Sequence, residues 1–182
     1  MSLSLPLTSL SLLYWYPIIY LPLIFTAWVA GRHLNYSARE MGLTVQKLPL
    51  QVLVALSGFV FAIVEYYILR PQSLITQLTW AEVLFPALVL MVSTGFGEEF
   101  IFRGLLQRAS KAALGKWNVI YVALLFTSFH LIHLSVIDII FVFVVGLFFG
   151  WVVNKTGSLL GVTLAHGITN IGLYLIIPLL LR

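Results

Sequence analysis

Long apolar stretches alternate with short polar connections along this chain. Each stretch is long enough, or nearly so, to cross a ~30 Å hydrocarbon core as a helix. Their apolar character is continuous rather than alternating, which favours helices over membrane-spanning strands. The pattern therefore predicts an all-α, multi-pass transmembrane helical bundle of about six spans, at residues 9–30, 50–69, 83–107, 118–134, 136–153 and 159–181.

The fourth and fifth stretches meet around Ser135 with almost no polar break between them. Two interpretations stay open there. The stretches are two separate spans, or they form one bent or partly re-entrant element. Re-entrant backbone is tolerated in a membrane only where surrounding protein shields it.

Composition supports an integral membrane protein. Hydrophobic residues make up 61% of the chain, charged residues 9%, and the mean hydropathy is +1.06, whereas soluble domains carry about 25% charged residues. The length of 182 residues fits one transmembrane domain over 1–182. The net charge of +4 lies between apolar stretches and does not predict a nucleic-acid surface. The chain has no cysteine, which excludes thiolate nucleophiles and disulfides.

Positive charge gathers in alternate connections between the stretches. Seven Lys or Arg residues follow the first, third and fifth stretches, and two lie at the opposite ends. The positive-inside rule therefore predicts that the first group is cytoplasmic and that both termini are outside. The seven are Arg32, Arg39, Lys47, Arg108, Lys111, Lys116 and Lys155, and the two are Arg70 and Arg182.

Two adjacent acids, Glu98 and Glu99, lie within the third apolar stretch. A charge near the bilayer centre costs at least ~2.5–3.5 kcal/mol, so acids there indicate a functional site. Glu99 and Arg103 are four residues apart on one helix face, which suits a buried ion pair in a supporting role. Glu98 is turned about 100° away in an α-helix, free to face a cavity as a general base.

Two more polar clusters follow in later stretches. His166 and Asn170 are four residues apart and offer two hydrogen-bond donors at one place, as an oxyanion hole requires. His130 could hold or polarise a water beside Glu98. At ~1.5 Å per residue, the depths of these four side chains agree to within about two helical turns, so they can meet in one cavity.

The remaining polar residues of the stretches predict lesser roles. We expect His133 to be an interfacial or loop histidine. Glu40, Glu65, Glu82 and Asp138 lie near loops or span ends, where long polar side chains reach water.

Three motifs, in this order and within apolar helices, resemble those of the CPBP family. This is the CAAX-protease and bacteriocin-processing (Abi) family of intramembrane glutamic endopeptidases. The motifs lie in 83–182, the expected catalytic core, whereas the spans within 1–82 carry none. They are Glu98-Glu99-x-x-x-Arg103, Phe126-x-x-x-His130 and His166-x-x-x-Asn170.

The resemblance implies a membrane-buried polar catalytic cavity and peptide-bond hydrolysis without a nucleophilic side chain. By analogy, Glu98 and His130 activate a water, and His166 with Asn170 stabilises the oxyanion. No cofactor and no metal is implied. The expected partners are the lipid bilayer and a peptide or protein substrate, such as a C-terminal or membrane-anchored segment. The expected location is a bacterial cytoplasmic membrane.

Other functions remain open from the sequence. Two histidines and a glutamate could ligate zinc in a metal-dependent intramembrane protease, although no His-Glu-x-x-His helix is present. Membrane-embedded Glu and His are also typical of proton pathways in transporters, although no internal repeat is visible. A non-enzymatic immunity protein that keeps the fold is the third alternative.

Overall fold

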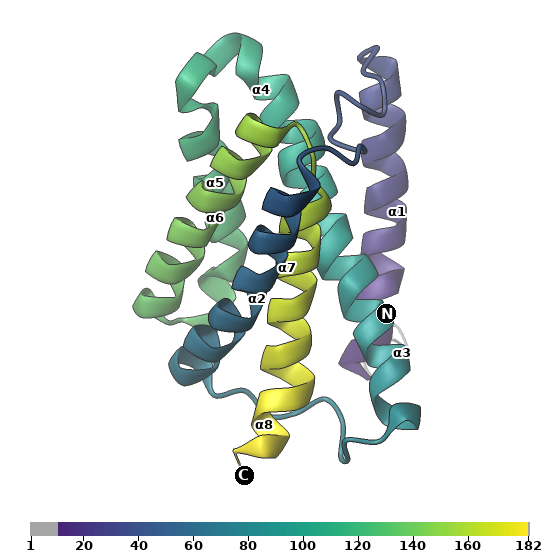
Figure 1. Ribbon diagram of the computed structural model, residues 1–182, viewed down its shortest axis with the longest axis vertical. Coiled ribbons are helices and arrows are strands. Elements are labelled where there is room, and N and C mark those ends of the chain that lie inside the picture. The colour runs from purple at the N-terminus through teal and green to yellow at the C-terminus, as the bar shows by residue number, and fades with distance from the viewer. Residues whose placement is uncertain (1–10, 182) are drawn as a thin grey trace, which may run out of the picture.

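The computed structural model describes residues 11–181, and every regular element in this range is a helix (Figure 1). Residues 9 and 10 of the first predicted span, and Arg182, lie outside the described residues. The elements are α1 (Leu12–His33), α2 (Leu48–Leu69), α3 (Trp80–Leu90), η2 (Met91–Glu98), η3 (Phe100–Leu106), α4 (Gln107–Leu114), η4 (Gly115–Trp117), α5 (Asn118–Ser128), η5 (Phe129–His133), α6 (Val136–Thr156), α7 (Leu160–Ile171), η6 (Gly172–Ile176) and α8 (Ile177–Leu180).

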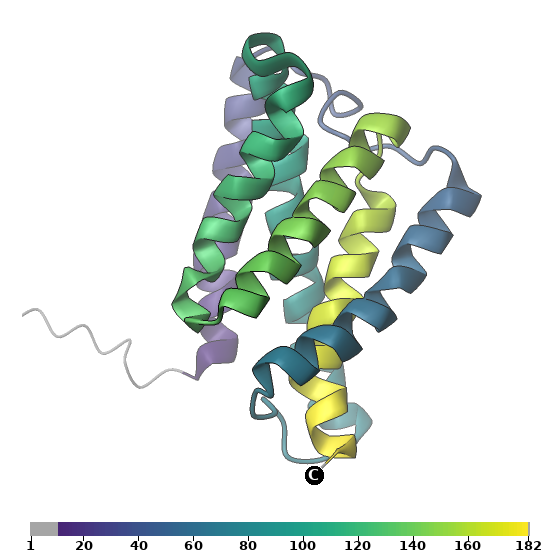
Figure 2. The same cartoon turned by 90° about the vertical axis from the view of Figure 1, so that its left-hand side faces the viewer.

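Five helical segments within residues 11–181 are long and apolar enough to cross a membrane. The third of them, Trp80–His133, is two crossings, because the chain reverses after α4 at Gly115 and returns along α5 (Figures 1 and 2). The predicted multi-pass bundle of about six spans is therefore confirmed. Successive crossings run in opposite directions, and the α1–α2, α4–α5 and α6–α7 connections lie at one end of the bundle (Figure 1).

The boundary around Ser135 is resolved in favour of two separate elements. The short helix η5 ends at His133, and Leu134 adopts a left-handed conformation with φ of 51°. The Ser135 side chain then accepts a hydrogen bond from the backbone N–H of Asp138 and so caps α6. This combination of a left-handed residue and an N-cap is a typical sharp turn between helices.

All seven of the predicted cytoplasmic Lys and Arg residues lie on or next to the connections at one end of the bundle. The connection between α1 and α2 is fixed to α4 there by an ion pair between Glu40 and Arg108, 2.8 Å long. The assignment of this end to the cytoplasm stays a prediction.

Small residues let α7 pack closely between α2 and η2. A side chain at Gly58 of α2 would overlap the backbone carbonyl of Ala165, and one at Gly95 of η2 would come within 3.0 Å of the backbone of Gly167. Close backbone approach at small residues is a usual basis of helix association in membranes. The Gly95 contact holds α7 against the helix that carries the adjacent acids, and the Gly58 contact holds α7 against α2.

Candidate active site

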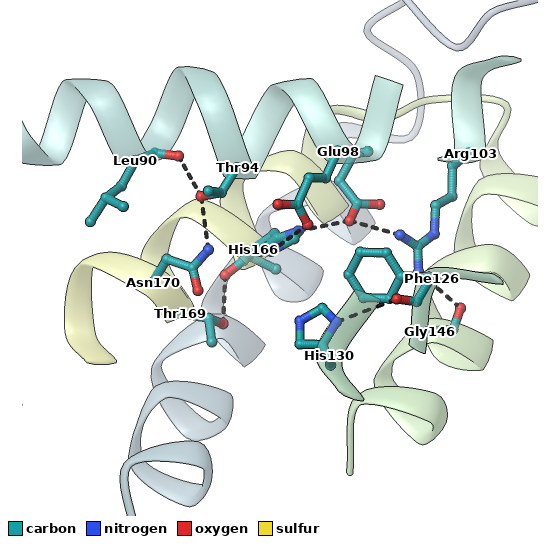
Figure 3. Close-up of polar contacts among 12 residues, drawn as sticks. Leu90, Thr94, Glu98, Arg103, Phe126, His130, Gly146, His166, Thr169 and Asn170 are labelled. Atoms are coloured by element: carbon teal, nitrogen blue, oxygen red, sulfur yellow. Dashed lines mark hydrogen bonds and ion pairs between the residues drawn. The ribbon is translucent and has the colours of Figure 1, made fainter. Parts of the chain in front are cut away.

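The acids Glu98 and Glu99 lie where two π-helical segments, η2 and η3, adjoin. The sequence predicts an ordinary α-helix here, with the two carboxylates about 100° apart. A π-helix has i→i+5 hydrogen bonds and therefore a wider turn, and it is frequent at functional sites. In the structure both carboxylates reach the same partner, His166 (Figure 3).

The expected ion pair between Glu99 and Arg103 is present. Glu99 Oε1 and Arg103 Nη1 are 3.1 Å apart, and both side chains are fully buried. Arg103 also donates to the carbonyl of Gly146 at 3.4 Å, and its guanidinium carbon lies 4.3 Å from the ring centre of Phe126. These contacts fix Arg103 behind the acids, where it compensates buried negative charge.

Glu98 occupies the position in front of this pair. Its Oε1 accepts a hydrogen bond of 2.5 Å from the hydroxyl of Tyr20 on α1, and its Oε2 lies 3.7 Å from Nε2 of His166. The side chain retains 13% of its exposure, in contrast to the fully buried Glu99. Glu98 is thus bound on two sides and still borders open space, rather than being free as the sequence suggested.

His166 and Asn170 both come from α7. His166 Nδ1 lies 2.8 Å from Glu99 Oε1, which leaves Nε2 on the Glu98 side. Asn170 Nδ2 donates to the hydroxyl of Thr94 at 2.8 Å, and Thr94 in turn donates to Leu90 O (Figure 3). An amide nitrogen carries two N–H groups, so one donor of Asn170 orients the side chain and the second is available to a ligand.

His130 lines the same cavity from η5, the short helix that follows α5. Its Nδ1 is 3.3 Å from the carbonyl of Phe126, and its ring packs against the Phe126 ring at 5.0 Å. The backbone contact orients the imidazole and leaves Nε2 without a protein partner among the described residues. No hydrogen bond joins His130 to Glu98, so they could share only a molecule that lies between them.

Glu98, His130, His166 and Asn170 all line one cavity of about 720 Å³. Its volume is within the usual range for small-molecule sites, ≈300–1,000 Å³. On α1 its wall runs from Tyr16 to Ala30, a length of roughly 21 Å at ~1.5 Å per residue. The structure brings the four predicted catalytic residues together, and their catalytic roles stay predictions.

The sequence missed several polar residues of this cavity. Glu65 is only 7% exposed and lines the cavity, and Asp138 is fully buried with Oδ2 3.0 Å from Nδ1 of His133. The expectation that Glu65 and Asp138 are solvated is therefore wrong, because neighbouring helices cover these span ends. His133 and Tyr20 also line the cavity. The signal in the sequence was that Glu65 and Asp138 are each the one charged residue of a predicted span, 50–69 and 136–153.

Among residues 11–181, no three His, Asp or Glu side chains are placed so that they could hold a metal ion together. The imidazoles of His130 and His166 come from different elements, η5 and α7, and Glu99 is paired with Arg103.

A family model described as type II CAAX prenyl endopeptidase Rce1-like matches residues 79–172, just over half of the chain. The chain belongs to that family. The match runs from the cap of α3 into the start of η6 and contains all three motifs, so the resemblance seen in the sequence is confirmed. No curated protein and no solved structure matches the chain.

Membership in this CAAX endopeptidase family implies an intramembrane protease. With the apolar helices, it supports an integral, multi-pass membrane protein that contacts the lipid bilayer and acts on a peptide substrate. The transporter alternative has no comparable support.

Proposed function

We propose that this protein is a glutamic intramembrane endopeptidase, in which Glu98 and His130 activate a water molecule and His166 with Asn170 stabilises the oxyanion. The observation that supports this most directly is the convergence of these four side chains, from η2, η5 and α7, on one membrane-buried cavity. A base, an orienting imidazole and two donors are what direct attack by water on a peptide carbonyl requires.

The proposed reaction has two proton transfers. Glu98 removes a proton from water as the water oxygen attacks the peptide carbonyl carbon, which gives a tetrahedral intermediate with a negative oxygen. The C–N bond then breaks, and the proton on Glu98 passes to the leaving nitrogen. The products are a carboxylic acid and an amine, and Glu98 is again ionised. His130, with Nε2 facing the cavity, holds the attacking water.

The contacts of His166 determine which protonation state it needs in order to stabilise an oxyanion. An ionised carboxylate only accepts hydrogen bonds, so the nitrogen facing Glu99 carries a hydrogen. Nε2 can donate to an oxyanion only if it also carries one, and His166 is then an imidazolium. That charge and the charge of Arg103 balance those of Glu98 and Glu99, which gives a buried cluster of zero net charge. Mutual compensation of this kind is how buried charges are tolerated.

Glu98→Gln tests the proposal, because glutamine keeps the shape and the contact with Tyr20 but cannot accept the water proton. Purified wild type and Glu98→Gln would be incubated in liposomes with quenched-fluorescence peptides containing an apolar segment, with and without EDTA. The new peptide termini would be identified by mass spectrometry. We expect turnover by the wild type in EDTA and none by Glu98→Gln.

Glu40→Gln is a suitable control, because it also removes one carboxylate, but at an exposed site away from the cavity. It should keep wild-type turnover. Near wild-type turnover by Glu98→Gln would refute the role of Glu98. Loss of wild-type turnover in EDTA, with recovery on addition of zinc, would favour the metal-dependent alternative.

A further inference from the structure

Glu65 is an acid of the cavity that the proposed reaction does not use. It is the only charged residue of α2 and is 7% exposed. No hydrogen bond or ion pair joins its carboxylate to another residue in the range 11–181. It lines the large cavity and also a smaller one of about 40 Å³, together with His130, His166 and Asn170. The Glu65 side chain therefore borders both cavities.

The register of α2 against α7 gives the depth of Glu65. Gln51 Oε1 accepts a hydrogen bond from the backbone N–H of Gly161, and Thr169 Oγ1 donates to Gly58 O. The contacting residues are 110 and 111 positions apart in the sequence, and α2 and α7 run in the same direction. Glu65 is therefore level with roughly residue 175, on the far side of Asn170 from the end bearing the seven Lys and Arg residues.

Within the described range, the walls of the cavity offer no Lys or Arg to Glu65, and the charge that the proposed mechanism gives His166 faces Glu98 and Glu99. Two acids, Glu65 and Glu98, line it, and no Lys or Arg does. Asp138 is engaged by His133, and Arg103 is engaged by Glu99 outside the lining. The other groups with ionisable side chains on the lining are the imidazoles of His130, His133 and His166 and the hydroxyls of Tyr16, Tyr20 and Tyr174.

A buried carboxylate without a partner is strongly disfavoured, and a guest that supplies a positive charge removes that penalty. The opposite end of the cavity has a different character. There the lining is apolar and includes Ala27, Ala30, Ile101, Leu105 and Leu106. A bound chain would thus meet apolar side chains on one side of Glu98 and a carboxylate on the other.

We propose that Glu65 is a specificity-determining residue that binds a Lys or Arg side chain of the substrate. The preferred substrate then has an apolar segment on the side of the Lys- and Arg-rich end, the scissile bond at Glu98, and a basic residue on the Glu65 side. This inference rests on the proposed peptidase function and deepens it. The contact is a charge-assisted hydrogen bond between an ammonium or guanidinium group and the Glu65 carboxylate.

The test uses matched peptides in which one residue is Lys, norleucine or Glu, placed at successive positions after an apolar segment. Purified protein in liposomes would be assayed for kcat/KM on each peptide. At one position we expect the wild type to prefer Lys over norleucine by about tenfold or more, as a hydrogen bond to a charged group provides. Glu65→Gln should bring that ratio close to one, and Glu65→Lys should favour the peptide with Glu.

A binding measurement tests this inference separately from the peptidase proposal. In the Glu98→Gln background, thermal shifts would report binding of the same uncleaved peptides, with and without Glu65→Gln. Preferential binding of the Lys peptide that is lost with Glu65→Gln supports the inference even if no peptide is cleaved. Glu82→Gln, which removes an acid near the same end but outside the cavity lining, should keep the wild-type ratio. An unchanged Lys preference in Glu65→Gln, or none in the wild type, would overturn it.

Discussion

Among single residues, Asn170 offers the most direct test of the oxyanion assignment. Its contact with Thr94 fixes the amide, so Asn170→Ala removes one oriented donor and leaves the helix intact. Loss of one such donor typically lowers kcat by ~10²–10³. We expect a fall of this size in single-turnover rates, with little change in thermal stability. A variant that retains more than a third of the wild-type rate would show that Asn170 does not contact the oxyanion.

Arg103 should affect stability more than chemistry. Arg103→Ala leaves the buried Glu99 without its arginine partner and in contact with His166 alone, and breaking a buried pair typically costs ~3–5 kcal/mol. Unfolding of the purified protein in mixed micelles, followed by circular dichroism, would measure the loss.

Arg108→Ala is the matched control for Arg103, because its pair with Glu40 is exposed and such pairs contribute ~0–1 kcal/mol. If Arg103→Ala is as stable as wild type but inactive, Arg103 takes part in the chemistry and the division of roles at the two acids is wrong.

The residues of the site differ in how far the sequence could predict them. The pair of Glu99 and Arg103 follows from a spacing of four, which holds even though the helix is π-helical. The contact of His166 with both acids does not follow, because it depends on the wider turn and on the packing of α7. Glu65 was misjudged because distance from a span end says nothing about which helices cover it.

At the scale of elements, the contact of α2 with α7 is the most sensitive to substitution. Gly→Ala in a helix interior is ordinarily stabilising by ~1 kcal/mol. In Gly58→Ala, however, the added methyl would overlap the carbonyl of Ala165, and overpacking typically costs ~1–3 kcal/mol. We expect a net loss of stability and reduced activity, measured by thermal unfolding and turnover. Val60→Ala, on the exposed face of the same helix, should change neither strongly.

The connection between α1 and α2 gives a pH-dependent contribution to stability. Hydrogen bonds from the backbone and side chain of Ser37, together with Arg108, lower the pKa of Glu40 from 4.5 to about 2. A lowered pKa in the folded state means that Glu40 stabilises the fold above pH ~4.5 and loses this effect as the pH falls towards ~2. Glu40→Gln should therefore melt slightly below wild type at pH 6 and together with it near pH 2, as seen in detergent by scanning fluorimetry. A deficit that persists at pH 2 would contradict this.

For the molecule as a whole, six crossings place residues 11 and 181, the ends of the described range, on one side of the membrane. The absence of native cysteine makes this simple to test with single substitutions. Ser110→Cys in α4 should react with an impermeant maleimide only after permeabilisation, whereas Gln72→Cys between α2 and α3 should react in intact cells. The reverse pattern would invert the orientation, and equal labelling of both would contradict the number of crossings.

The architecture as a whole was more predictable than its details. Hydrophobic length alone indicated the six crossings, because the bilayer sets the length of each helix. The turn at Ser135 was ambiguous, because a left-handed Leu134 gives no signal in the sequence. The π-helical form of η2 and η3 was equally hidden, because the apolar stretch predicts a helix without distinguishing its turn.

One oxygen atom, Oε1 of Glu99, contacts both Arg103 and His166. Selection for folding and selection for turnover therefore both act to conserve this residue. Relaxing only one of them does not leave Glu99 free to change. Glu98 has no arginine partner among residues 11–181, so folding constrains it less than it constrains Glu99. In a lineage that gives up catalysis but keeps the protein, Glu98 should drift first, while Glu99 and Arg103 persist as a record of the ancestral enzyme.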